Sequence, residues 1–356
     1  MMMRRVILPA LLAMGTLPAS ALADVRMGVL GLFHSREIVA RSADGNGLAV
    51  RTDRGTCALR GREAIHVSEA GGSMQLVCGG RTTHIQTLRI TSPVGGVAGI
   101  ELSIPGKISR MFHGRVEVTS SGGALVPIVS MDLETAVASV VAAEQVERTP
   151  IEALKAQAIA ARSYLVAARG RHRGFDFCDT THCQFLREPP AADHPAMRAT
   201  RDTIGLVLAF RGAPIAALYS ASCGGRTRSL AAAGLPATDG YPYFSVDCSY
   251  CVRHAHAWER RLPLDAAARQ LDATRSEAAR LAVDRRSGWS AVPGNNFEAA
   301  GDLDALVLRG RGAGHGVGLC QTGAAGLAVE SAATFAQILD HYYPGTTLMV
   351  MPSQAR

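Results

Sequence analysis

The stretch MDLETAVASVVAAEQVERTPIEALKAQAIAARSYLVAAR, residues 131–169, decides the fold of the surrounding chain. Its first half predicts a helix, because Asp132 can accept an orphan backbone N–H as the N-cap and apolar side chains then recur every three or four positions. This stripe consists of Leu133, Val137, Val140 and Val141, and its next position is Glu144. A carboxylate is therefore predicted on the packed side of the helix.

Glu144 allows two interpretations at this point. Burial raises the pKa of a carboxyl group and can keep it protonated near neutral pH, which a general acid requires. Charges near helix ends are also often displaced from the packed side, in which case Glu144 faces solvent or pairs with Arg148. The local pattern alone favours this second interpretation.

The second half of the stretch predicts another helix. Thr149 is expected as its N-cap, Pro150 at the first helical position and Glu152 as the partner that completes a capping box. Its many alanines allow a neighbouring segment to approach closely. The apolar face is made of Ile151, Leu154, Ala158, Ala161 and Leu165.

The first residues predict export. Two arginines precede an apolar run in MMMRRVILPALLAMGTLPASALA, residues 1–23, and the last three residues fit the pattern for signal-peptide cleavage. Cleavage after Ala23 removes Arg4 and Arg5 and no acid, which changes the formal charge from +7 to +5. We expect a secreted protein of the periplasm or cell envelope, with no membrane span after cleavage.

The remaining sequence predicts an α+β fold with a small β-rich N-terminal domain. Residues 24–110 contain short strands between glycine-rich turns and are expected to form this accessory domain. Residues 111–350 are expected to form a catalytic or binding domain, in which helices and short strands surround a groove. Within it, strands are expected at 206–210 and 215–220, and helices at 264–281 and 335–343.

The basic residues argue against nucleic-acid binding. They are scattered along the chain, whereas a nucleic-acid site needs a basic patch or stripe. Mild attraction to an anionic polymer of the cell envelope fits the expected compartment better.

A loop after the paired helices is a candidate metal site. His172, Cys178, His182 and Cys183 fall within twelve residues and suit tetrahedral zinc, which prefers imidazole and thiolate ligands. All four positions would be filled by protein, so such a site would be structural. A Cys178–Cys183 disulfide with solvated histidines is the alternative.

The chain has eight cysteines, and the others also invite disulfides or metal. Cys57 and Cys78 lie in one strand-rich segment and are expected to pair. Cys248-x-x-Cys251 could join the two cysteines of the candidate zinc loop in a four-thiolate site. A local disulfide or structural metal is the default for this pair, since no strand–CxxC–helix context supports a redox function.

Two glycine-rich segments are candidates for substrate binding. GHGVGLCQTG, residues 314–323, could line a groove with His315 and Gln321, and a nucleophile such as Cys223 or Cys320 could use His315 as its base. SASCGGRT, residues 220–227, offers hydroxyls and approachable backbone N–H groups for sugar or carboxylate oxygens, although a structural turn explains it equally well. The candidates within this second segment are Ser220, Ser222, Gly224, Gly225, Arg226 and Thr227.

Five blocks together resemble the stage II sporulation protein D family, which also includes amidase enhancers. They are VVAAEQ…PIEALKAQAIAARSYL, DTTHCQ, YSASCGGRT, GHGVGLCQTGA and ILDHYYPGT, in family order between residues 113 and 350. The founding member of that family is a lytic transglycosylase acting on peptidoglycan glycan strands whose stem peptides have been removed. The resemblance implies that Glu144 is catalytic and that the histidine–cysteine loop binds structural zinc, while Cys248 and Cys251 depart from the family pattern.

The implied chemistry needs only one carboxylate. Glycoside hydrolysis usually uses two, whereas lytic cleavage between MurNAc and GlcNAc uses the sugar's own 6-hydroxyl as the nucleophile. Glu144 would protonate the glycosidic oxygen and then accept the 6-hydroxyl proton, which leaves a 1,6-anhydro-muramic end. No cofactor is needed at this centre.

A function of a different class would retain the same groove. In this alternative the chain is a non-catalytic module that binds peptidoglycan and stimulates a separate cell-wall amidase. Glycan strands are the expected partner of both the enzyme and the enhancer, whereas an amidase is an expected partner of the enhancer alone. Only the enzyme needs an ionisable Glu144.

Overall fold

The computed structural model describes residues 24–146, 148–237, 240–301 and 304–351. It has the mixed α+β architecture that the sequence predicts. The expected signal peptide, residues 1–23, lies outside the described residues. No helix in the described ranges is long and apolar enough to cross a membrane.

The N-terminal part is one large sheet. Among the described residues it has twelve strands, antiparallel except where β12 joins β1 in parallel. A single long strand, β10, holds it together, because residues 108–114 pair with β9 and residues 115–121 with β11. The strands are β1 (Val25–Gly28), β2 (Glu37–Ser42), β3 (Leu48–Thr52), β4 (Gly55–Leu59), β5 (Ala64–Ala70), β6 (Ser73–Cys78), β7 (Arg81–Ile85), β8 (Leu88–Thr91), β9 (Ala98–Ile104), β10 (Ile108–Ser121), β11 (Ala124–Met131) and β12 (Phe177–Cys178).

The expected division at residue 110 falls inside β10, so this strand belongs to both of the predicted domains. Gly114 lies where β10 changes partners, and a Cβ there would come within 2.5 Å of the Ser130 carbonyl oxygen. The buried core of the sheet also continues into the helix that follows β11 through Val137 and Val141. The predicted disulfide between Cys57 and Cys78 is confirmed, and it joins β4 to β6.

Two helices follow the sheet, α1 (Leu133–Glu144) and α2 (Ile151–Ala167). Asp132 caps α1 as predicted, since its carboxylate accepts the Thr135 N–H at 3.0 Å. The predicted capping box of α2 is wrong: Pro150 is the N-cap and no side chain caps the helix. Glu152 instead accepts the backbone N–H of Phe335 at 2.8 Å, so a tertiary contact takes the carboxylate that the local pattern assigned to its own helix.

Helix α2 is buried on nearly all sides, not on one face alone. Its small side chains let α1, α3 (Pro195–Asp202), α8 (Gln321–Glu330), α9 (Phe335–Tyr342) and the strand β13 (Leu206–Phe210) approach it. Arg162 is fully buried on α2, and its guanidinium donates to both carboxylate oxygens of Glu134 at 2.8 and 2.6 Å. A fully buried charge persists here because it is paired and hydrogen-bonded.

A third part of the chain forms a separate lobe, with β16 (Ala257–Pro263), β17 (Phe297–Gly301) and β18 (Ala305–Arg311) in one antiparallel sheet. The single helix expected at 264–281 is wrong, because two helices, α6 (Ala266–Thr274) and α7 (Glu277–Ser287), occur there. Arg275 between them has a left-handed φ of 47°, and Ser276 caps α7.

Short elements complete the fold. The predicted strand at 206–210 is confirmed, whereas only the last two residues of 215–220 are in a strand. The helix predicted at 335–343 is confirmed as α9. The short elements are a 3-10 turn (Gly31–Phe33), β14 (Ala213–Pro214), β15 (Tyr219–Ser220), α4 (Leu230–Ala233), α5 (Ser249–His254), β19 (Leu319–Cys320) and β20 (Thr347–Val350).

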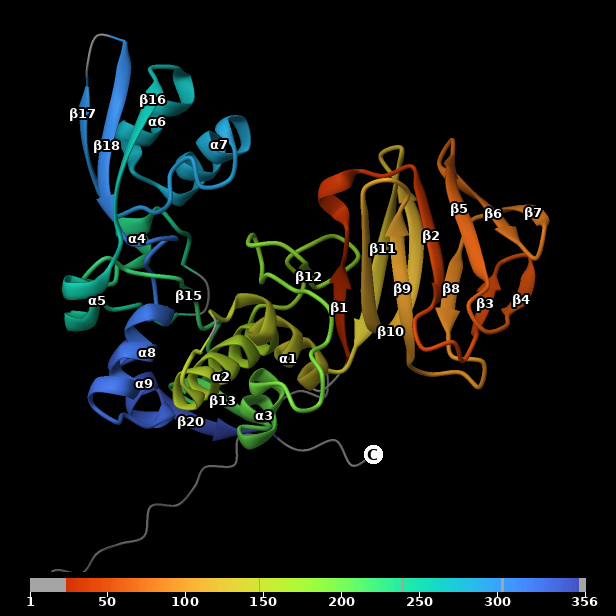
Figure 1. Cartoon of the computed structure of the whole chain (residues 1–356), viewed down its shortest axis with the longest axis horizontal. Coiled ribbons are helices and arrows are strands. Elements are labelled where there is room, and N and C mark those ends of the chain that lie inside the picture. The colour runs from red at the N-terminus through yellow and green to blue at the C-terminus, as the bar shows by residue number, and fades with distance from the viewer. Residues whose placement is uncertain (1–23, 147, 238–239, 302–303, 352–356) are drawn as a thin grey trace, which may run out of the picture.

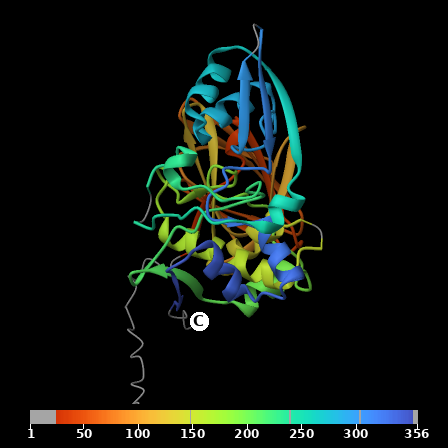
Figure 2. The ribbon, with the colours of Figure 1, turned by 90° about the vertical axis from the view of Figure 1, so that its left-hand side faces the viewer.

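The three parts meet around one cavity. Figure 1 shows the sheet on one side, the helices α1, α2, α8 and α9 below, and the lobe of β16–β18 with α6 and α7 above and opposite the sheet. Turned by 90°, the helices gather at one end of the molecule and the strands β17 and β18 reach to the other (Figure 2). A cavity of about 560 Å³ lies between them, lined by residues of β10, α1, α7 and the loops after β12 and β15.

Candidate active site

Glu144 is the last residue of α1 and lies on the wall of this cavity. The helical stripe brings it there, since its position continues the row of buried valines. Arg148 is exposed, and no ion pair joins it to Glu144 among the described residues. The structure therefore gives Glu144 the inward position, which the local pattern had not favoured.

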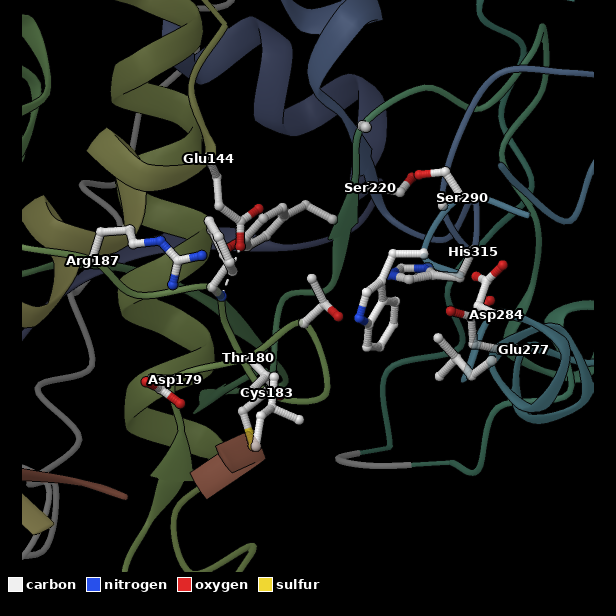
Figure 3. A pocket seen from close by; sticks show the side chains of 18 of the residues that line it. Glu144, Asp179, Thr180, Cys183, Arg187, Ser220, Glu277, Asp284, Ser290 and His315 are labelled. Atoms are coloured by element: carbon white, nitrogen blue, oxygen red, sulfur yellow. Dashed lines mark hydrogen bonds between the residues drawn. The ribbon is translucent and has the colours of Figure 1, made fainter. Parts of the chain in front are cut away.

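The Glu144 carboxyl group is enclosed by two neighbours. The backbone N–H of Phe185 donates to its Oε1 at 3.0 Å, the contact drawn as a dashed line in Figure 3. The Tyr219 hydroxyl faces the same carboxylate, although among the described residues it makes no well-aligned hydrogen bond. Burial raises the pKa of Glu144 to about 7, and the Phe185 N–H and the Tyr219 hydroxyl lower it in part. Such a group is half protonated near neutral pH, as a general acid requires.

Glu144 also lines a second, smaller cavity. It measures about 340 Å³ and shares Glu144, Ala221 and Gln321 with the first. The Gln321 side-chain amide donates to the backbone carbonyl of Glu144 at 3.2 Å, so it holds the end of α1 between the two cavities. An extended polymer that occupies both cavities would therefore pass this carboxylate.

The opposite wall of the larger cavity comes from the lobe. His315, Glu277 and Asp284 face Glu144 and Arg187 across it (Figure 3). The Val317 N–H donates to Nδ1 of His315 at 3.0 Å, so Nδ1 is the unprotonated nitrogen. Burial lowers the pKa of His315, with Glu277 acting in the opposite direction.

The other acids that line the cavity are already engaged. Arg280 binds Glu277 at 2.6 Å and Asp284 at 2.8 Å. Asp179 accepts the backbone N–H of Leu30 at 3.0 Å, and burial raises its pKa. Among the described residues, neither Glu144 nor Asp179 pairs with an arginine, and each accepts one backbone N–H, but Glu144 is the one whose pKa is raised to about 7.

Of the two glycine-rich segments, only some predicted residues reach the cavity. His315, Gln321 and Ser220 line it, and the Ser220 hydroxyl is buried without a partner among the described residues.

The rest of segment 220–227 packs within the protein: a Cβ at Gly224 would meet Asn296 and Arg311, and Gly225 lies against Val252. Arg226 pairs with Asp247 at the surface, Thr227 bonds to the backbone at Phe244 and Val246, and Ser222 contacts Cys251.

The predicted zinc ligands come together beside the cavity. One ligand atom from each of His172, Cys178, His182 and Cys183 lies within 4.8 Å of all the others. Nε2 of His172 is 3.2 Å from Sγ of Cys183, and Nδ1 of His182 is 3.7 and 3.6 Å from the two sulfurs. Both cysteines are free thiols in the structure, which does not contain the alternative disulfide. These separations suit one tetrahedral ion.

The histidine–cysteine cluster is connected to Glu144 by the residues that directly follow Cys183. Cys183 and Phe185 both line the cavity, and Phe185 supplies the N–H that binds the carboxylate. Arg187 lies next along the loop, with its guanidinium 3.6 Å from the centre of the Phe185 ring.

Cys248 and Cys251 do not join the histidine–cysteine loop. The structure groups them with Cys223 and Cys320, and the four sulfurs lie within 4.8 Å of one another. The four-thiolate site with Cys178 and Cys183 is therefore wrong. Cys223 and Cys320 are buried and do not line the cavity, which leaves the thiol nucleophile without support from this geometry.

Sequence reasoning missed several residues of the cavity. Phe185 and Arg187 could have been suspected, since they follow the candidate ligands directly in a loop dense with aromatic residues. The acids and arginine of α7 recur at positions 277, 280 and 284, a spacing that puts them on one helix face. Tyr219 and Trp289 carry no comparable signal, because an isolated aromatic residue is compatible with any packed surface.

Part of the chain resembles known proteins. Residues 121–210 match the family SpoIID, described as stage II sporulation protein. An uncharacterized protein of Brachyspira hyodysenteriae is 26% identical over 271 residues, which cover 67% of this chain and 72% of the relative. The family match includes both helices, Glu144 and the histidine–cysteine loop.

Proposed function

We propose that this chain, whose residues 121–210 match the SpoIID family associated with cell-wall remodelling, is a lytic transglycosylase of peptidoglycan. The observation that carries the proposal is the position of Glu144, a carboxyl group with a pKa of about 7 at the junction of two cavities. A glycan strand threaded through both cavities would present a glycosidic oxygen to this group.

The proposed reaction uses Glu144 twice. The protonated carboxyl donates its proton to the glycosidic oxygen as the bond from that oxygen to C1 of the muramic sugar breaks. The 6-hydroxyl oxygen of the same sugar then bonds to C1, and its proton returns to the Glu144 carboxylate. The products are a 1,6-anhydro-muramic end and a new 4-hydroxyl, and no water is consumed.

The remaining acids of the cavity support lytic cleavage over hydrolysis. Hydrolysis usually needs a second carboxylate as a base or nucleophile. Glu277 and Asp284 are bound to Arg280, and Asp179 is bound to the backbone at Leu30. Two of these three acids are therefore paired with an arginine, and lytic cleavage needs none of the three, because the substrate supplies its own nucleophile.

Arginine side chains in the cavity support a substrate whose stem peptides have been removed. Such a strand carries a free lactyl carboxylate on each muramic sugar. Arg187 and Arg110 line the cavity, Arg110 with Glu188 at 3.6 Å, and guanidinium groups bind carboxylates in a bidentate manner. Trp289 is 60% exposed at the same cavity and offers an apolar ring face to a sugar.

The proposal includes a structural zinc ion held by His172, Cys178, His182 and Cys183. Bound zinc would hold together the loop that leads to Phe185, and the Phe185 N–H in turn binds Glu144 at the end of α1. It would take no part at the reacting centre, since protein ligands fill all four positions. We also propose that the chain is exported to the cell envelope, which the Cys57–Cys78 disulfide supports.

Digestion of cell walls tests the proposal. The purified protein, its Glu144→Gln variant and a control, Glu298→Gln on the exposed part of β17, are incubated with intact sacculi and with sacculi stripped of stem peptides by an amidase. Mass spectrometry should find anhydro ends, one water lighter than hydrolytic ends, from the wild type and the control on stripped glycan. Equal release by Glu144→Gln would refute the catalytic assignment, and release of water-containing ends would indicate a hydrolase. A wild type that releases nothing but accelerates an added amidase would favour the enhancer alternative.

A further inference from the structure

We propose that Cys223, Cys248, Cys251 and Cys320 form a second metal site, which binds zinc through four thiolates. All four side chains are buried, and their sulfurs lie within 4.8 Å of one another. The site is separate from the histidine–cysteine cluster and from the cavity, and it contains no residue of either.

The spacing of the sulfurs fits a single ion. Four thiolates around zinc at a Zn–S distance of about 2.3 Å are separated by about 3.8 Å along each edge of the tetrahedron. The sulfurs of Cys251 and Cys320 are 3.5 Å apart. Disulfide-bonded sulfurs would lie roughly 2.0 Å apart, and none of these four cysteines is in a disulfide. An iron–sulfur cluster, with several metal atoms between the thiolates, would spread the sulfurs more widely.

The surroundings of the sulfurs suit thiolates. The backbone N–H groups of Cys223 and Gly323 each donate to Sγ of Cys320 at 3.3 Å. Cys320 is also the N-cap of α8, a ten-residue helix whose N-terminus favours negative charge. The Tyr342 hydroxyl lies 3.3 Å from Sγ of Cys248. Such outer hydrogen bonds orient and tune metal ligands, whereas buried neutral thiols need none of them.

The four cysteines come from three segments that are far apart in the sequence, and a bound metal ion would explain why their sulfurs lie together. Cys223 lies in the turn after β15, Cys248 and Cys251 flank the start of α5, and Cys320 ends β19. Helix α5 lies beside α8 (Figure 1). An ion bound by all four would cross-link three segments of chain, and this cross-link supplies a reason for four buried cysteines to meet at one point.

The cross-link would act on the wall that faces Glu144. Strand β15 pairs in parallel with β19, so that Tyr219 lies opposite Leu319 and Ser220 opposite Cys320. Gln321, which holds the backbone of Glu144, follows Cys320 directly. A metal at this point would therefore set the positions of Tyr219 and Gln321 from behind the cavity.

Metal analysis of matched variants tests the site. Zinc is counted by mass spectrometry in protein purified without a chelator. We expect two zinc ions per chain in the wild type and in Glu144→Gln, and a loss of one in Cys248→Ser/Cys251→Ser. The double variant Cys178→Ser/Cys183→Ser should lose the other. If the histidine–cysteine loop binds no zinc, the wild type should carry one ion instead of two. Loss of that ion in Cys248→Ser/Cys251→Ser would still support the four-cysteine site.

A measurement on the unaltered protein covers the case in which the cysteine variants fail to fold. Anomalous diffraction at the zinc edge from wild-type crystals should show a peak between the four sulfurs. Absence of that peak, a mapped disulfide between any two of the four cysteines, or iron with visible thiolate absorption in place of zinc would overturn the proposal. Because Glu144→Gln keeps both ions, failure of the metal site is distinguishable from failure of the proposed catalysis.

Discussion

The side-chain amide of Gln321 donates a hydrogen bond to the backbone carbonyl of Glu144 at 3.2 Å, across 177 positions of sequence. It joins the start of α8 to the end of α1, where the last carbonyl groups of a helix lack partners within the helix. The position of Glu144 at the end of α1 therefore depends on Gln321, which directly follows Cys320 of the proposed four-cysteine site.

Replacement of Gln321 by methionine should lower kcat about fivefold and leave KM nearly unchanged. Methionine fills a similar volume without the donor, and one hydrogen bond is worth roughly 1 kcal/mol, a factor of about five in rate. Steady-state kinetics on peptide-stripped glycan measures the effect. A rise in KM at constant kcat would instead show that Gln321 mainly binds the glycan.

The activity should fall as pH rises through about 7, because the reaction begins with protonated Glu144 and its pKa is raised to about 7. Tyr219→Phe removes a hydroxyl that lowers this pKa, so the fall should move to higher pH. The profile of kcat/KM reports the free enzyme and is the quantity to measure. A profile that moves to lower pH, or does not move at all, would contradict the contact between Tyr219 and Glu144.

The same burial predicts that Glu144→Gln stabilises the protein at alkaline pH. The carboxyl pKa is 4.5 in the absence of perturbation and about 7 in the native state. The native state therefore loses stability between these values as pH rises, by up to about 3 kcal/mol, because ionisation is then harder in the folded protein. Glutamine does not titrate and keeps an oxygen for the Phe185 N–H.

Chemical denaturation at pH 5 and pH 8 checks this difference. The variant and the wild type should be close at pH 5, and the variant should be more stable at pH 8. Glu298→Gln on exposed β17 controls for the loss of one negative charge. Equal differences at both pH values would mean that the Glu144 carboxyl is not enclosed.

Arg187→Gln should weaken binding of peptide-stripped glycan about tenfold. A charge-assisted hydrogen bond to a lactyl carboxylate contributes about 1.5 kcal/mol or more. Binding is measured in the Glu144→Gln background to prevent turnover, with chitin oligosaccharides, which lack the lactyl group, as the control ligand. Arg187→Lys should restore part of the affinity. An equal loss for both ligands would show that Arg187 acts only by stacking on Phe185.

Much of the candidate site follows from short-range patterns. The Asp132 cap and the apolar stripe predict α1 and its packed side, because both depend only on helical geometry over a few residues, although the local pattern alone favoured a Glu144 that faces solvent. The histidine–cysteine cluster is also local, since twelve residues of loop can bring four ligands together. The same locality explains the error at α2, where the distant N–H of Phe335 competes for Glu152.

The sequence by itself determined the two helices, the inward side of α1 and the residues able to act as acid or ligands, because helical periodicity and ligand chemistry are properties of short segments. Only the tertiary structure decided that Glu144 is enclosed by Phe185 and Tyr219, that Gln321 holds its backbone, and which cysteines share a site. These contacts join segments separated by tens to more than a hundred residues, and their partners are set by how the sheet, the helices and the lobe pack around one cavity.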